Sequence, residues 1–498
     1  MPIFIKTTAQ MLPYKSLIQI DRESSVTLYI QVCNTFITLI TNGTLKPSDI
    51  LPSSRVLSEL IGINRNTVKL AYEELISQGW AESIDRKGVF VLSKLPIISK
   101  VKLPENDKNQ RQEGFIWENK FQKEIIISGK SIQKDQIIID DGFPDVRLAP
   151  IDQLMREYRS LSKKFYGKNF LKYGSTMGSE NLRLSICGYL SNTRGLTVSP
   201  ENIIITKGSQ MGIYLASQLI LNPNDTIAVG ISSFTTADET FKYSGANLER
   251  IPIDENGMDT DYLEEILKDK KIKAVYIIPH HHCPTGVTMS MERRLKLLNL
   301  AKEYRFAIIE DDYDFDFHYE NKPYLPLASI DHNQNVIYIG SISKTFAPAL
   351  RIGFMIASPM FIEAAAALRK MIDRQGDTLL EEAFAVLFEN GEMERHFRKS
   401  LKIYKQRRNH FCDILQSDFK NEIEFKIPEG GLAVWANFHQ NINLEKMSND
   451  ASAKGLSISN GKFYKNDFFH TNAIRMGFAS LTENEMEKAF VILKKVLQ

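Results

Sequence analysis

The chain of 498 residues carries a formal net charge of +2, with 43% hydrophobic and 24% charged residues. Ordinary apolar content and near-zero net charge exclude a disordered chain, and the length suggests roughly two to four domains. No apolar run reaches the roughly 18 residues of a membrane span, and the first residues lack a secretory signal. The cysteines, Cys33, Cys187, Cys283 and Cys412, form no CxxC pair. We therefore expect reduced thiols, a cytoplasmic protein and no membrane partner.

Residues 24–94 are predicted to form a compact, helix-rich unit. Apolar spacing predicts a first helix over 28–43 that stops at Gly43. Pro52 and Ser53 begin a short second helix that ends at Gly62, and a longer third helix lies within 63–80. This order is the helix-turn-helix pattern. The residues expected to face inward from the third helix are Val68, Leu70, Ala71 and Leu75.

Polar and basic side chains gather where such a unit would meet DNA. The start of the third helix, the end that enters the major groove, carries Arg65, Asn66, Thr67 and Lys69. Arg55 on the second helix is placed to bind a phosphate. ESIDRKGVFVL predicts a two-stranded wing with Arg86, Lys87 and Gly88 at its tip. The alternative, a helical module with merely solvated charges, is disfavoured because motif, wing and charge placement agree.

This stretch closely resembles a known DNA-binding family. LPSSRVLSELIGINRNTVKLAYEELISQGW is similar to the winged helix of the GntR family over about seventy residues. The resemblance implies operator DNA as a partner, with contacts by Arg55, Asn64, Arg65 and Lys69 and a wing at Lys87 and Gly88. Asn64 stands where the family usually has Ser or Thr.

Residues 95–115 are charged, contain two prolines and show no period, which predicts a linker. From 116 to 498, short apolar runs alternate with amphipathic stretches. This predicts an α/β domain with a mixed, mostly parallel central sheet and helices on both faces. We expect a smaller C-terminal α/β subdomain from about residue 375. Such sheets bind ligands at the carboxyl ends of their strands.

The residues after these runs suit the chemistry of pyridoxal 5′-phosphate. That cofactor needs a lysine for a Schiff base and an acid that keeps the pyridine nitrogen protonated. Lys344 follows the run NVIYIG, and Asp311 ends the run FAIIED. The other candidates are Tyr313 for the ring oxygen, Ser341 beside the lysine, Phe234 for ring stacking, Arg351 with the amides of Gly208, Ser209 and Gln210 for the phosphate, and Arg475 for a substrate carboxylate.

Other site types are weaker interpretations of the same residues. A lone S-x-x-K pattern carries little weight, and DDYDFDFHYE is compatible with a metal site or an acidic loop. His280, His281 and His282 suggest zinc, but adjacent side chains alternate in direction and no fourth ligand is evident, so we expect no metal. A dinucleotide-binding site and a P-loop are disfavoured, because neither of their motifs, GxGxxG and GxxxxGK[ST], occurs. The joint order of phosphate helix, stacking ring, acid, lysine and late arginine favours the pyridoxal site.

That order resembles the fold-type I, aspartate aminotransferase-like enzymes over nearly all of residues 120–498. PHHHCPTGVTMSMERRLKLLNLA, IIEDDYDFDFHYE and VIYIGSISKTFAPALRIGFM are most similar to the MocR/GabR branch, which fuses a GntR winged helix to an aminotransferase-like domain. The resemblance implies a homodimer that binds pyridoxal 5′-phosphate. It assigns Lys344 to the Schiff base, Asp311 to the ring nitrogen, Tyr313 to the ring oxygen, Arg351 and the partner-reaching Tyr173 to the phosphate, and Arg475 to an effector carboxylate.

The chain departs from the family pattern at three positions. Gly230–Phe234 lacks the usual Glu and Pro, Cys283 stands where aminotransferases carry Asn, and Thr235 replaces the arginine of members that respond to gamma-aminobutyrate. The resemblance implies a transcription regulator that senses the cofactor, a small amine or an amino acid. The alternatives are an active aminotransferase with an accessory DNA-binding domain, and a constitutive DNA-binding protein in which the cofactor is only structural.

Overall fold

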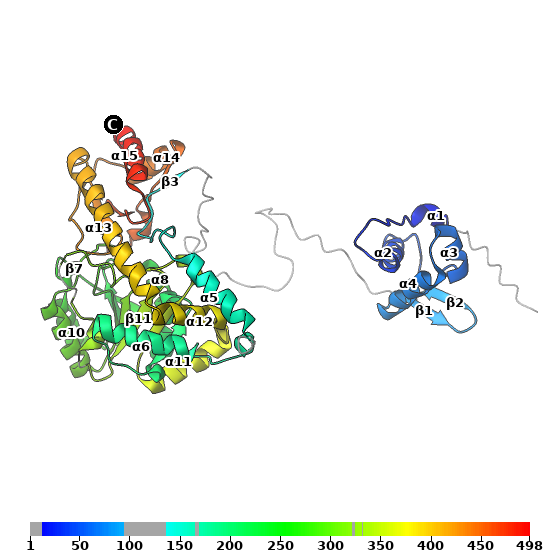
Figure 1. Cartoon of the computed structure of the whole chain (residues 1–498), viewed down its shortest axis with the longest axis horizontal. Helices are drawn as coiled ribbons and strands as arrows, with labels where there is room; N and C mark the ends of the chain where they lie inside the picture. Colours follow the sequence, from blue (N-terminus) through cyan, green and yellow to red (C-terminus); the bar gives the residue numbers. More distant parts are fainter. Residues whose placement is uncertain (1–11, 94–135, 165–168, 321–323, 331) are drawn as a thin grey trace, which may run out of the picture. The chain divides into compact units, whose positions relative to one another are not determined.

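The computed structural model describes residues 12–93, 136–164, 169–320, 324–330 and 332–498. Contacts divide the chain into two units, Met1–Asn119 and Lys120–Gln498 (Figure 1). The expected linker, 95–115, lies outside the described residues. None of the described helices is long and apolar enough to cross a membrane.

The first unit contains the expected helix-turn-helix and wing. Its elements are α1 Tyr14–Leu17, α2 Leu28–Thr41, α3 Ser54–Ile61, α4 Arg65–Ser77, β1 Ala81–Ile84 and β2 Gly88–Val91, and the two strands pair antiparallel. Ser53 caps α3 by accepting from the Val56 amide, and Gly62 ends it in the left-handed conformation. Asn64 caps α4 by accepting from the Asn66 amide at 2.8 Å. These caps fix the turn between the two helices.

One inward-facing residue of α4 was predicted wrongly. Val68, Ala71 and Leu75 are fully buried, whereas Leu70 is 51% exposed. At 100° per residue, Leu70 lies about 200° around the helix from Val68, on the opposite face. Tyr72 is buried in its place, and its hydroxyl donates to the Pro52 carbonyl at 2.7 Å, which ties α4 to the start of α3.

A seven-stranded sheet forms the centre of the second unit. Its order is β4-β12-β11-β10-β9-β5-β6, with bounds β4 Ile203–Thr206, β5 Thr226–Gly230, β6 Asn247–Ile251, β9 Ala274–Ile277, β10 Ala307–Asp312, β11 Val336–Ser341 and β12 Gly353–Ile356. β12 runs antiparallel to both neighbours, and the other pairs are parallel. The mixed, mostly parallel sheet is therefore confirmed. A short antiparallel pair, β7 Ile253–Asp254 and β8 Gly257–Met258, follows β6.

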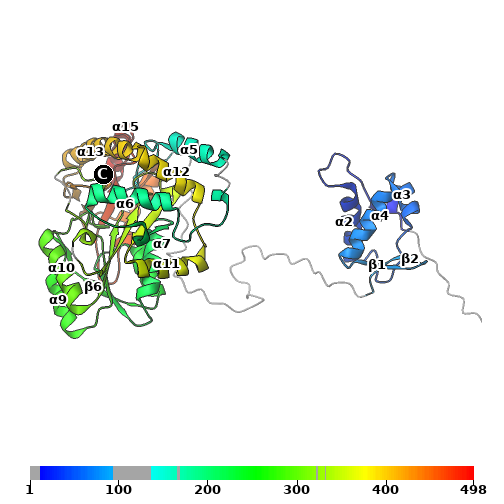
Figure 2. The same cartoon turned by 60° about the horizontal axis from the view of Figure 1, so that its bottom comes forward.

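Helices cover both faces of this sheet (Figure 2). Ile204 packs in one apolar core with α7 Ser209–Ile220, α8 Thr235–Tyr243 and α11 Pro359–Ile372. Its neighbours Ile203 and Ile205 point the other way, into a core with α5 Ile151–Lys163, α6 Glu180–Arg194 and α12 Thr378–Glu389. A third core joins the strands to α9 Thr260–Asp269 and α10 Met291–Tyr304. Residues buried on both sides explain the unbroken apolar runs in the sequence.

A smaller subdomain has its own core and sheet. β13 Ile423–Glu424, β14 Ala433–Phe438 and β16 Ala473–Gly477 form the sheet, and α14 Leu444–Ala453 and α15 Glu483–Leu497 pack with it. The long helix α13 Glu392–Asp418 joins two cores, because Phe397 packs with α12 and Phe411 with the smaller subdomain. β3 Ile137–Ile138 pairs with β15 Leu456–Ser457, so residues from before the large sheet also enter this subdomain.

Candidate functional site

Lys344 lies three residues beyond the end of β11, half-buried among groups from distant parts of the chain. Its backbone amide donates to the Ser341 hydroxyl at 3.4 Å. Its ammonium lies 4.1 Å from the centre of the Phe143 ring and 5.8 Å from that of Tyr313. Burial lowers the pKa of Lys344, and the charge of Arg475 lowers it further. This amine therefore loses its proton more readily than a surface lysine, as a nucleophilic amine requires.

Asp311, near the carboxyl end of β10, is 2% exposed. The Tyr276 hydroxyl, from neighbouring β9, donates to Oδ2 of Asp311 at 2.8 Å, while Oδ1 has no hydrogen-bond partner. Burial raises the pKa of Asp311 to about 7, and the charge of Lys344 acts in the opposite direction. Lys344 and Asp311 therefore share one electrostatic environment. A buried carboxylate oxygen without a partner fits a protonated ring nitrogen.

The raised pKa of Asp311 predicts a pH effect on stability. The folded state holds this proton up to about pH 7, but the unfolded chain releases it near pH 4. The contribution of Asp311 to the free energy of unfolding is thus present at low pH and is lost as the pH rises through 7. Without cofactor, we expect the free energy of unfolding of the wild type, relative to Asp311→Asn, to fall by roughly 1–3 kcal/mol between about pH 5 and pH 8. Urea denaturation at both pH values measures it, and a pH-independent difference would contradict the assignment.

Arg475, in β16, contacts Tyr313, the residue whose ring lies near the Lys344 ammonium. It is 4% exposed, and its Nη2 donates to the Tyr313 hydroxyl at 3.0 Å. The Tyr313 hydroxyl in turn donates to the His281 carbonyl at 2.9 Å. Nε and Nη1 of Arg475 are buried and have no partner. A buried guanidinium with two unpaired donor nitrogens is suited to bind a carboxylate.

An anion cradle lies at the start of α7. Gly208 precedes the helix at φ 75°, and no side chain caps the first amides. The Arg351 guanidinium lies so close that a Cβ on Gly208 would be 2.7 Å from its Nη2. Arg351 is held there by a 2.7 Å hydrogen bond from Nη2 to the Lys207 carbonyl. Unpaired helix amides beside a guanidinium fit a phosphate group.

The remaining candidates differ in how closely they approach this site. Phe234, half-buried just before α8, packs at the edge of the same apolar core as Tyr313 and Cys283. The Gln210 side chain turns toward α8 and donates to Thr240 at 2.9 Å. Tyr173 is 77% exposed, with the Arg374 guanidinium 4.0 Å from its ring centre. Among the described residues, no contact joins Tyr173 to Lys344 or Asp311.

The three consecutive histidines each have a protein partner. His280 bonds the Tyr324 carbonyl at 2.8 Å, His281 bonds Asp314 at 2.9 Å, and His282 bonds Thr285 at 2.8 Å. Within the described residues, no group of three His, Cys, Asp or Glu side chains is arranged to hold a metal. Burial lowers the pKa of His282 to about 3, so this ring is neutral at physiological pH.

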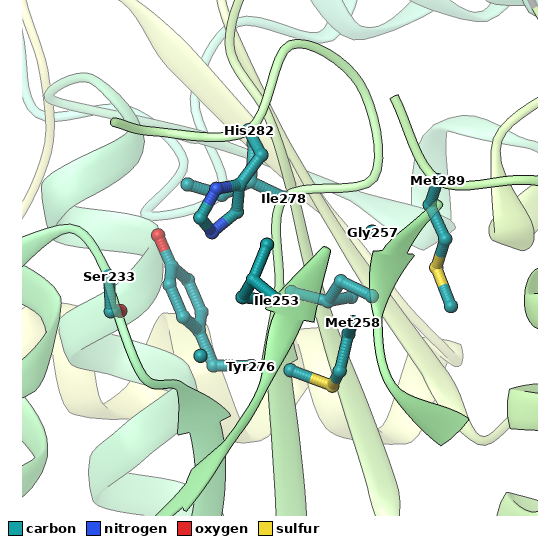
Figure 3. Close-up of a pocket in the computed structure, with 10 residues that line it drawn as sticks. Ser233, Ile253, Gly257, Met258, Tyr276, Ile278, His282 and Met289 are labelled. Carbon is teal, nitrogen blue, oxygen red and sulfur yellow. The ribbon is translucent and has the colours of Figure 1, made fainter. Parts of the chain in front are cut away.

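A narrow cavity is lined by Tyr276, the residue whose hydroxyl donates to Asp311. Figure 3 shows Tyr276 with its hydroxyl turned toward the His282 ring, and Ser233 and Met258 nearby. The cavity volume is about 10 Å³, which is room for roughly one water. An amino acid therefore does not fit in this cavity.

Two contacts of this site were missed in the sequence. Tyr276 belongs to a strand-like run, and β9 and β10 pair in parallel with Tyr276 opposite Ile309. A known strand order would have placed it beside Asp311. Phe143 carries no such signal, because the pairing of β3 with β15 positions it across more than 300 residues of sequence.

In the first unit, the predicted DNA-contacting side chains lie around the helix-turn-helix and the wing. All are exposed except Thr67, which is half-buried; the exposed set is Arg55, Asn64, Arg65, Asn66, Lys69, Lys87 and Gly88. Arg65 donates through Nε to the Ser54 hydroxyl at 3.3 Å, so its side chain lies between the starts of α3 and α4. Arg55 forms an exposed ion pair with Glu59 at 3.2 Å.

Comparison with known families covers both units. Residues 145–493 match the model "Aminotransferase class I and II". The chain belongs to this family. Residues 28–91 match "Bacterial regulatory proteins, gntR family". The predicted union of a GntR domain with an aminotransferase-like domain is therefore confirmed, and so is the fold class.

The similar proteins include both aminotransferases and transcription regulators. The chain is 31% identical to "Aromatic-amino-acid aminotransferase 1" of Thermococcus litoralis, over 73% of this chain and 88% of that protein. It is 24% identical to "Probable rhizopine catabolism regulatory protein MocR" of Rhizobium meliloti, over 95% of this chain and 94% of that protein. Among solved structures, the multiple substrate aminotransferase of Thermococcus profundus is 29% identical with a TM-score of 0.68, over 76% and 96% of the two chains.

Proposed function

We propose that this protein is a homodimeric, cytoplasmic transcription regulator that binds operator DNA through its first unit. Its second unit binds pyridoxal 5′-phosphate and responds to the cofactor, a small amine or an amino acid. The observation that carries the proposal is a gntR-family match and an aminotransferase-family match in one chain. Similarity to the MocR regulator along nearly the whole chain supports it, and the free cysteines among the described residues agree with a reducing compartment.

The residues of the second unit have distinct roles in this proposal. When bound, the cofactor supplies an aldehyde that captures amines and a protonated ring that withdraws electrons. Lys344 holds it covalently, Asp311 accepts from the ring nitrogen, and Tyr313 contacts the ring oxygen. Ser341 steadies the lysine, Phe234 stacks on the ring, and Arg475 binds the effector carboxylate. The phosphate ligands are Arg351, the first amides of α7 with Ser209 and Gln210, and Tyr173 from the partner subunit.

In the first unit, α4 enters the major groove and the wing follows the adjacent backbone. The proposed contacts are Arg55, Asn64, Arg65, Asn66, Thr67, Lys69, Lys87 and Gly88. Regulation requires that the dimer adopt two arrangements, one that binds operator DNA tightly and one that binds it weakly. An effector changes DNA affinity only if it binds these two arrangements with different affinities. Lys344 would hold the cofactor in one arrangement and would carry a free amine in the other, where an amine ligand occupies its place.

A working aminotransferase is the second candidate, because the chain is 31% identical to an aromatic-amino-acid aminotransferase. Two measurements on the same holoprotein separate the candidates. We expect binding to the intergenic region beside its own gene to change with cofactor or with one member of an amine panel. Steady-state release of keto acid at roughly 1 per second or faster, with operator affinity unaffected by cofactor and amines, would favour the enzyme instead.

A further inference from the structure

The segment Asp140–Phe143 forms part of the site's boundary, and β16 holds it in place. The Asp140 carbonyl accepts from the Gly477 amide at 2.7 Å. The Asp140 carboxylate accepts from the amides of Gly142 and Phe143 at 2.8 and 2.9 Å, and from the Ser480 hydroxyl at 2.6 Å. Both oxygens of this carboxylate therefore already accept hydrogen bonds, one from the segment's own backbone and the other from Ser480.

The two residues after Asp141 contact the two cations of the site. A Cβ on Gly142 would lie 3.5 Å from Nε and from Nη2 of Arg475, so the backbone here passes directly beside the guanidinium. The Phe143 ring lies 4.1 Å from the Lys344 ammonium. Asp141 is therefore the neighbour in sequence of two residues that contact the two cations.

Asp141 is half-buried and has one hydrogen-bond partner among the described residues, the Tyr464 hydroxyl, which donates to it. Its negative charge opposes the lowering of the Lys344 pKa by burial and by Arg475, and it contributes to the raised pKa of Arg475. No ion pair of the described chain includes Asp141. Nε and Nη1 of Arg475 also lack partners. The site therefore presents an unpaired cation and an unpaired anion close together.

A ligand's charges must complement both groups. A carboxylate bound by Arg475 also lies in the field of Asp141, and this repulsion weakens binding of neutral or acidic amino acids. A second positive group on the ligand offsets the repulsion and pairs with the carboxylate that Tyr464 orients.

We propose that Asp141 selects a basic amino acid as the effector, one that carries a second amino group on its side chain. This inference rests on the proposed function and specifies its ligand class. The α-amino group of the ligand would take the place of the Lys344 amine on the cofactor aldehyde and release that amine, the carboxylate would bind Arg475, and the side-chain ammonium would bind Asp141. A diamine without a carboxylate would leave the two unpaired donor nitrogens of Arg475 buried and unused, which is unfavourable.

The test is calorimetric titration of the cofactor-loaded full chain with L-lysine, L-ornithine, L-norleucine, L-glutamate and 1,5-diaminopentane. We expect lysine or ornithine to bind roughly 10-fold or more tightly than norleucine, the size of a charge-assisted hydrogen bond. Glutamate should bind most weakly, and the diamine more weakly than lysine. In Asp141→Asn, which keeps an acceptor for Tyr464, the preference for lysine should fall below about 3-fold.

Two controls distinguish a loss of the preference for lysine from a general disruption of the binding site. Asp152→Asn, an exposed position in α5, should keep the wild-type preference, and an unchanged cofactor absorption spectrum in Asp141→Asn shows an intact site. Equal wild-type affinity for lysine and norleucine, or a preference that survives in Asp141→Asn, would overturn the role of Asp141. If the loaded protein binds none of the five compounds, this inference fails, whereas the proposed function fails only if operator affinity is unchanged by cofactor and by the whole amine panel.

Discussion

Replacement of Lys344 by alanine should abolish covalent attachment of pyridoxal 5′-phosphate and weaken its binding. The wild-type protein is expected to be yellow when purified, and borohydride should fix the cofactor to Lys344. The half-buried amine, with its pKa lowered by burial and by Arg475, is the one nucleophile that we assign to the aldehyde. Without it, the cofactor keeps only its non-covalent contacts, among them those with Asp311 and with the cradle of Gly208 and Arg351. We expect its apparent affinity to fall by roughly 100-fold, about 2.7 kcal/mol.

Mass spectrometry of the reduced, digested protein measures the result. The matched control is Lys370→Ala, which removes an exposed lysine of α11 and should remain yellow. Circular dichroism and the unfolding midpoint show whether Lys344→Ala is folded. A folded Lys344→Ala protein that still carries covalently fixed cofactor would contradict the assignment, as would a colourless wild type that cannot be reconstituted.

Arg65→Ala should cause the largest loss of operator binding among single substitutions in the first unit. Arg65 is the first residue of α4, is exposed, and lies against Ser54 at the start of α3. A lost base or phosphate contact typically costs about 1–3 kcal/mol, which is roughly a 5- to 150-fold weaker affinity. Arg55→Ala should act similarly, although its ion pair with Glu59 must break before it binds a phosphate.

Fluorescence anisotropy at two or more salt concentrations checks this expectation. If the lost contact is to a phosphate, the slope of log affinity against log salt should decrease by about one. Lys15→Ala removes an exposed charge in α1 of the same unit and serves as the control. Equal losses for Lys15→Ala and Arg65→Ala would indicate a diffuse electrostatic attraction in place of a defined recognition helix.

The sequence predicted the parts of the site that lie at strand ends. Lys344 and Asp311 were found because they follow apolar runs, and parallel strands bring their carboxyl ends to one edge of a sheet. The expectation for Leu70 failed because an apolar residue at helical spacing i+2 was assigned to the buried face. Tyr276 required knowledge of strand order, which the apolar runs do not encode.

The parts of the site that the sequence did not predict are positioned by strand pairing between distant segments of the chain. Asp141 and Phe143 reach the site because β3 pairs with β15 and the Asp140 carbonyl accepts from Gly477. No local pattern near Asp141 signals a partner more than 300 positions away. The pKa of Asp311 could not be predicted from the sequence either. Its value of about 7 results from burial by several elements together.

The most direct test of the regulator proposal is operator affinity for the wild type and Lys344→Ala, each with and without pyridoxal 5′-phosphate and the responding amine. Coupling of 1–3 kcal/mol is typical between linked sites. We expect cofactor with amine to change the wild-type dissociation constant by at least about 5-fold, and Lys344→Ala to bind DNA with an affinity that neither compound alters. An operator affinity identical in every combination, or an equal response by Lys344→Ala, would contradict a regulator whose signal passes through this lysine.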